Sequence, residues 1–136
     1  MKKILSIALA LMMVVGSAAY AATGGFDFSF APGNWLGIGK KLTATSTEVS
    51  KADSEAKAYV TISTNELASG DEVKVFVRNA SGTQVTNSVM VNSETTKANQ
   101  SYKSSSPAYG ANVKYTLRGE AELLTDNGYF SGRWTP

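Results

Sequence analysis

The sequence contains no cysteine and no histidine. Without cysteine the chain has no disulfide, no thiol nucleophile and no thiolate ligand for zinc, so packing and backbone pairing must stabilise the fold. Without histidine it lacks the most common general base near neutral pH, and with it Ser-His triads and histidine-ligated zinc. We therefore predict that the protein is not an enzyme and that it binds neither a cofactor nor a metal.

Long apolar runs are also scarce, and the single extended one lies at the N-terminus. Lys2 and Lys3 precede an apolar stretch over residues 4–15, and Ala19-Tyr20-Ala21 has the small-x-small pattern of a secretory cleavage site. The stretch is shorter than the roughly 20 residues that a permanent membrane span needs. We expect residues 1–21 to be a cleaved bacterial signal peptide and residues 22–136 to form one secreted domain.

Excess charge of either sign is absent from the expected mature chain. Two of the 13 Lys and Arg residues lie in the leader, so the remainder balance the 11 Asp and Glu residues and the net charge becomes zero. A neutral domain lacks the basic surface that nucleic-acid binding requires. It is also poorly suited to adhere to anionic lipid by charge alone, so membrane contact is not expected from charge.

The mature chain consists of short segments in which apolar and polar residues alternate, separated by turn signals. Alternation with a period of two is typical of half-buried strands. Asp126-Asn127-Gly128 is a strong tight-turn signal, and the polar stretch 92–108 is the longest expected loop. The expected strands cover residues 26–30, 42–49, 56–64, 73–78, 84–91, 112–123 and 129–134.

This spacing of about seven to eight short strands favours an all-β fold, an antiparallel β-sandwich of immunoglobulin-like or similar type. In the third strand we expect Ala56, Ala58, Val60 and Ile62 to point inward. No internal repeat is evident.

One carboxylate pair is the remaining candidate for catalysis or cation binding. Glu120 and Glu122 lie two residues apart and would share one face of a strand, with Asp126 close behind. Paired carboxylates serve glycoside hydrolysis, and clustered oxygens suit calcium. A solvated strand face that balances Lys114 and Arg118 explains the same residues more simply, so we assign no catalytic, cofactor or metal site.

Aromatic side chains are the better candidates for recognition, because they stack on sugars and lodge at bilayer surfaces. We predict surface contacts through Trp35, Tyr102, Tyr109 and Trp134. The segment that alternates Phe26, Phe28 and Phe30 before Trp35 is either core or an element for insertion or assembly, with core packing as the default interpretation.

The C-terminal quarter carries a family resemblance. Tyr115-Thr116-Leu117-Arg118-Gly119, the ending Ser131-Gly132-Arg133-Trp134 and the short leader resemble small, uncharacterised secreted proteins of Gram-positive bacteria. The chain lacks the acidic tail that is expected after the tryptophan. The resemblance implies a small β-sandwich released from the cell, and it supplies no catalytic or binding residues.

These observations predict a secreted, non-enzymatic binding or structural protein that acts at the cell envelope or in the extracellular matrix. Its expected partner is a protein or glycan at a cell surface, and self-association through sheet edges is an open alternative. The second hypothesis is a bacteriocin-like toxin whose segment from Phe26 to Trp35 engages a target membrane.

Overall fold

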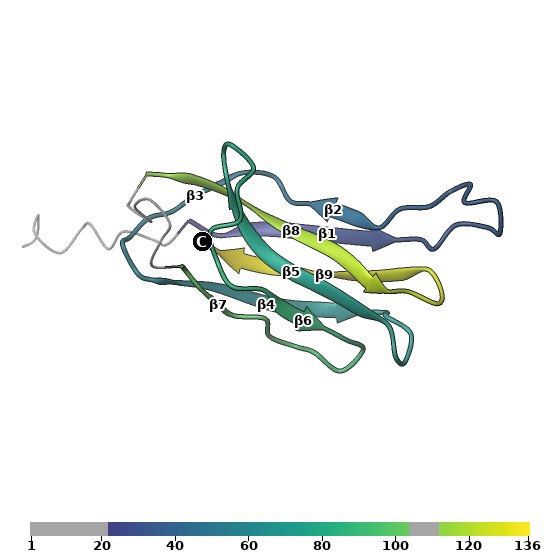
Figure 1. Cartoon of the computed structure of the whole chain (residues 1–136). Helices are drawn as coiled ribbons and strands as arrows, with labels where there is room; N and C mark the ends of the chain where they lie inside the picture. Colours follow the sequence, from purple (N-terminus) through teal and green to yellow (C-terminus); the bar gives the residue numbers. More distant parts are fainter. Residues whose placement is uncertain (1–21, 104–111) are drawn as a thin grey trace, which may run out of the picture.

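The computed structural model describes residues 22–103 and 112–136. This part of the chain contains no helix and forms two antiparallel sheets of four and five strands (Figure 1). The strands are β1 (Gly24–Phe30), β2 (Thr43–Thr45), β3 (Val49–Ser50), β4 (Lys57–Asn65), β5 (Glu72–Asn79), β6 (Val89–Val91), β7 (Gln100–Ser101), β8 (Lys114–Leu123) and β9 (Gly128–Thr135). The first sheet has the order β1-β9-β4-β7; the second has the order β2-β8-β5-β6, and β3 also pairs with β8.

The core between the sheets is built on the alternation of β1. Phe26, Phe28 and Phe30 are buried there with Phe130 of β9, while Asp27 and Ser29 are exposed. The ring of Phe28 meets that of Phe130 edge-on, with 5.7 Å between centroids. The default interpretation of this segment as core is therefore confirmed for its three phenylalanines.

A glycine in the second sheet makes room for these rings. A Cβ atom on Gly119 of β8 would lie 3.0 Å from ring atoms of both Phe28 and Phe30. Any larger side chain at this position would push the β1 rings away from the second sheet. The glycine thus sets how closely β8 approaches β1.

One lateral side of the molecule is closed by hydrogen bonds between the two sheets. Thr86 and Tyr102 form an isolated bridge, and Asn87 N donates to Ser101 O at 3.0 Å. The buried Thr86 hydroxyl donates to Gln100 Oε1 at 2.8 Å. These contacts join residues 86–87, just before β6, to the outer edge of β7, where an unpaired strand would otherwise invite association.

The structure confirms an all-β antiparallel chain and corrects three details. The expected strand 42–49 is two short strands, because Ser46 interrupts it: its N donates to Leu117 O and its Oγ accepts from Leu117 N. Ala56 is exposed rather than inward, since it precedes β4.

The third correction concerns the expected loop 92–108. Its described part runs beside β4: Ile62 N donates to Thr96 O, and Ala98 N donates to Val60 O. It also contains β7. The leader expected over residues 1–21 and the rest of this loop lie outside the described residues.

Candidate contact surface

The connection from β1 to β2 is an ordered projection, residues 31–41, which we call the 31–41 hairpin. At its base, Ala31 and Lys41 exchange two backbone hydrogen bonds of 2.8 Å. Further out, Asn34 N donates to Ile38 O at 2.9 Å. The hairpin is therefore held by cross-strand pairing along its length.

Asn34 also organises the turn at the tip. Its Oδ1 accepts from Leu36 N at 3.0 Å and from Ile38 N at 2.9 Å, while Gly37 N donates to its backbone oxygen at 2.8 Å. Gly37 has a φ of 77°, in a region that L-residues rarely adopt. Asparagine and glycine thus fix a turn that apolar side chains alone would not specify.

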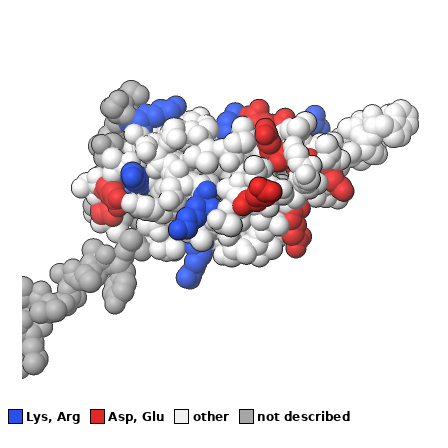
Figure 2. All heavy atoms as spheres, turned by 90° about the horizontal axis from the view of Figure 1, so that it is seen from below, with Lys and Arg blue, Asp and Glu red and all other residues white. Residues whose placement is uncertain are grey.

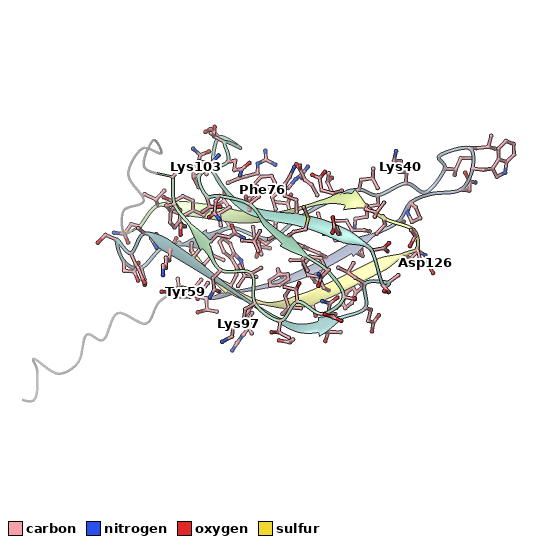
Figure 3. The ribbon with its side chains drawn as sticks, turned by 60° about the horizontal axis from the view of Figure 1, so that its bottom comes forward. Lys40, Tyr59, Phe76, Lys97, Lys103 and Asp126 are labelled. Carbon is pink, nitrogen blue, oxygen red and sulfur yellow. The ribbon has the colours of Figure 1, made fainter. Side chains whose placement is uncertain are left out.

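The hairpin carries the three most exposed large apolar side chains of the described chain. Trp35 is 91% exposed, Ile38 67% and Leu36 61%. Figure 3 shows the hairpin reaching well beyond the body, with labelled Lys40 between body and tip. The three most exposed large apolar side chains of the described residues therefore lie together on one projecting element.

Charged groups stand behind the tip rather than on it. Lys41 Nζ donates to Ser29 Oγ at 2.7 Å, which ties this lysine to β1. Glu66 lines a hollow beside Lys41, and Glu122 lines a hollow beside Lys40. Figure 2 shows the end of the projection free of charge, with acidic atoms gathered over the neighbouring part of the body.

The other expected contact residues are placed differently. Trp134 is 1% exposed and Tyr102 is 7% exposed, and both belong to the core, so their assignment to the surface is corrected. In β9, Trp134 follows Phe130 at even spacing and shares its inward face. Tyr109 lies outside the described residues. Of the four, Trp35 is exposed as a contact residue requires.

A buried lysine gathers polar groups at the opposite end of the core. Lys51 Nζ lies 3.0 Å from Asp53 Oδ1, donates to the Pro136 backbone oxygen at 2.8 Å, and lies 5.0 Å from the ring centroid of Tyr102. A backbone hydrogen bond from Glu55 and the bond with Lys51 lower the pKa of Asp53. Burial raises the pKa of Tyr102. The ammonium is paired on several sides, so these partners compensate the cost of burying its charge.

The carboxylate pair of β8 converges on a lysine. Lys74 Nζ lies 2.6 Å from Glu122 Oε1 and 3.7 Å from Glu120 Oε2, and Glu120 also lies 3.5 Å from Arg118 Nε. The hydrogen bond with Glu122 raises the pKa of Lys74. Of the pair Glu120 and Glu122, only Glu122 lines one of the described hollows. These hollows therefore do not hold both carboxylates around a substrate.

The sequence interpretation named Trp35 but missed Leu36 and Ile38. The indication was available: residues 35–38 place three large apolar side chains between glycines, directly after the turn signal Pro32-Gly33-Asn34. Such residues have no alternating strand pattern that would bury them. Apolar side chains inside a glycine-rich turn are therefore candidates for an exposed contact.

Three further findings concern the described residues and the chain as a whole. In residues 22–103 and 112–136, no three acidic side chains gather as a metal site. The same residues include no helix of the length and apolar character needed to cross a bilayer. Comparison with protein-family models, curated proteins and solved structures finds no match to this chain.

Proposed function

We propose that this protein is a secreted, non-enzymatic binding protein that acts at a cell surface and uses the 31–41 hairpin as its contact surface. The observation that carries the proposal is the exposure of Trp35, Leu36 and Ile38 on one hydrogen-bonded projection. Monomeric proteins seldom expose contiguous large apolar groups without a partner. A tryptophan anchor on a preorganised loop also loses little conformational entropy on binding.

The non-enzymatic assignment draws support from the polar groups. Both carboxylates of β8 pair with Lys74, Glu120 also pairs with Arg118, and the buried Lys51 pairs with Asp53. These ion pairs account for the charged side chains without a substrate. Secretion rests on the pattern of residues 1–21, and the architecture we infer is a β-sandwich of immunoglobulin-like or similar type.

In the bacteriocin-like alternative, the part of the chain that can contact a membrane is smaller than the sequence suggested. That alternative assigned membrane contact to the whole segment from Phe26 to Trp35, but the three phenylalanines are buried in the core. Releasing those rings would dismantle β1, at a cost of several kcal/mol for each ring. This counts against the segment as an insertion unit and leaves the tip of the hairpin as the only part of it available for contact.

Retention on bacterial cell envelopes tests the proposal. Protein comprising residues 22–136 is sedimented with isolated envelopes, beside a variant that combines Trp35→Ala, Leu36→Ser and Ile38→Ser. We expect the wild type to be retained and the triple variant to lose at least about tenfold in affinity. Met90→Ser, which alters an exposed apolar side chain on β6, is the matched control and should bind like wild type.

Equal retention of the wild type and the triple variant would place the contact elsewhere and refute the role of the hairpin. Circular dichroism of the variants, recorded alongside, should show unchanged β-structure, since the three side chains lie outside the core.

A further inference from the structure

We propose that the 31–41 hairpin inserts its tip into the interface of a lipid bilayer, driven by apolar transfer rather than by attraction to anionic headgroups. The inference rests on the proposed function, which makes this hairpin the contact surface, and it names the partner as lipid. Four features of the hairpin and its surroundings carry the inference.

The first feature is the composition of the tip. Between Asn34 and Lys40 the only side chains are those of Trp35, Leu36 and Ile38, and the two other residues are glycines. Tryptophan favours the bilayer interface, where its apolar ring is buried and its N–H stays near water. The two aliphatic side chains flank it without any charge that would oppose insertion.

The second feature is the satisfaction of backbone donors. A segment that leaves water must pair its N–H groups internally, since lipid offers no acceptors at depth. In the tip, the N–H groups of Leu36 and Ile38 are bonded to Asn34 Oδ1, that of Gly37 to Asn34 O, and that of Asn34 to Ile38 O. The turn therefore enters an apolar phase with most of its donors already paired.

The third feature is the order of charge along the hairpin. Lys40 follows the apolar residues and has no ion pair among the described residues, so it lies at the level where headgroups would meet the inserted tip. A long lysine side chain at such a position keeps its ammonium in the polar layer. Behind it stand carboxylates of the body, including Glu66 and Glu122, with Asp126 labelled at the same end in Figure 3.

These carboxylates determine the lipid preference. They oppose close approach to an anionic surface and offset Lys40 and Lys41. Binding should therefore depend on burial of the tip and differ little between zwitterionic and anionic membranes. The same charges disfavour a flat protein interface around the hairpin, because carboxylates are depleted from interface cores.

The fourth feature is the lack of a receptor for the tip on the described surface of this chain. Away from the hairpin, the exposed large apolar side chains are Tyr59, Met90 and Leu123, on three different strands. The hollow beside Lys40 is lined by three leucines, but it also contains the charged side chains of Lys40 and Glu122. Within residues 22–103 and 112–136, a second copy therefore offers no cluster of exposed large apolar side chains to receive three of them, whereas a bilayer accommodates them without one.

Vesicle partition with tryptophan fluorescence tests the inference. Protein of residues 22–136, free of the apolar leader, is titrated with vesicles of phosphatidylcholine alone and of phosphatidylcholine with phosphatidylglycerol. Trp35 emission should shift to the blue and become protected from acrylamide on binding, while Trp134, already 1% exposed, supplies a constant background. Partition into the two vesicle types should differ by less than about threefold and change little with salt.

Two variants of the tip, with one control, test whether the apolar side chains drive the binding. Trp35→Ala should weaken partition about tenfold or more, and the double variant Leu36→Ser/Ile38→Ser by a similar factor. Met90→Ser should partition like wild type. Binding only to anionic vesicles, lost in high salt and indifferent to Trp35→Ala, would overturn the inference in favour of charge adsorption.

The envelope experiment separates the failure of this inference from failure of the proposed function. Absence of binding to either vesicle, with hairpin-dependent retention on delipidated cell wall, would overturn the lipid assignment and point to a protein or glycan. In that case the hairpin would remain the contact surface. Absence of hairpin-dependent binding to vesicles, envelopes and cell wall alike would refute both.

Discussion

At the scale of single residues, Gly132 is the described glycine where an added Cβ atom would meet the closest neighbour. A Cβ atom there would lie 1.9 Å from the carbonyl oxygen of Thr61, an atom of the neighbouring β4 backbone that no rotamer change can move. We expect Gly132→Ala to lower the free energy of unfolding by about 3 kcal/mol, because the two central strands of the first sheet must separate locally. Urea denaturation measures the change.

Gly25 of β1, which pairs with the other edge of β9, provides the control. It lies opposite Arg133, and a Cβ atom on it would meet nothing closer than 3.9 Å. Gly25→Ala should change the free energy of unfolding by no more than about 0.5 kcal/mol. A comparable loss in both variants would show that the steric argument for Gly132 is wrong.

Residue by residue, the sequence predicted burial well where alternation was unbroken. The phenylalanines of β1 follow the period of two and lie in the core. Trp134 was assigned to the surface although the same period of two places it on the inward face with Phe130. The error arose because the tendency of tryptophan to form surface contacts was given more weight than the alternation of the strand. Tyr102 had no such pattern: its burial depends on Lys51 and Thr86, which are distant in sequence.

At the scale of elements, Asp71 fastens the β4–β5 turn to the β8–β9 turn. Its buried Oδ1 accepts hydrogen bonds from the backbone N of Thr125 at 2.8 Å and from the hydroxyl of Thr125 at 2.7 Å. Burial alone would raise the pKa of this carboxyl, but these hydrogen bonds and one from the backbone of Asp126 outweigh it and lower the pKa. The ionised form therefore joins the two turns.

The sign of the pH dependence follows from that lowered pKa. A group whose pKa is lower in the folded than in the unfolded chain adds stability above the unfolded pKa and loses it as pH falls through the folded pKa. We expect Asp71→Asn to lower the free energy of unfolding by about 2 kcal/mol at pH 7. The deficit should shrink as the pH falls below about 4. Denaturation measured across this range checks both statements.

Asp126→Asn, in the same turn but exposed, is the comparison. It should differ from wild type by no more than about 0.5 kcal/mol throughout that range. A deficit of Asp71→Asn that stays constant down to pH 2 would mean that the carboxylate charge does not hold the turns.

Element boundaries show what local sequence misses. The pattern predicted β5, β8 and β9 within a few residues because each lies in a sheet with one buried face. It joined β2 and β3 into one strand, since nothing local reveals that Ser46 exchanges hydrogen bonds with Leu117 across the sheet. The sequence pattern also predicted a loop where residues 96–101 pair with β4. This pairing depends on tertiary contacts, which a polar sequence without alternation does not indicate.

At the scale of the whole molecule, the outer strands of the two sheets must be held together without a disulfide, so that they do not pair with other chains. On one side the 31–41 hairpin joins β1 to β2 directly, so the connection covers that end of both strands. On the other side closure depends on Thr86, whose hydroxyl accepts from Val77 N at 2.9 Å and donates to Gln100 Oε1 at 2.8 Å. One buried hydroxyl thus bridges the second sheet to the first.

Replacing that hydroxyl should loosen the closure and leave the core intact. Thr86→Val keeps the shape but leaves Val77 N–H and Gln100 Oε1 without this partner, so we expect the free energy of unfolding to fall by about 1–3 kcal/mol. Hydrogen exchange should rise more at residues 85–87 and in β7 than in β1 and β9, because the Thr86 hydroxyl joins these segments. Thr43→Val, at an exposed position of β2, should leave exchange unchanged. A uniform rise across all strands after Thr86→Val would mean that Thr86 supports global stability and that the two edges are held together by other contacts.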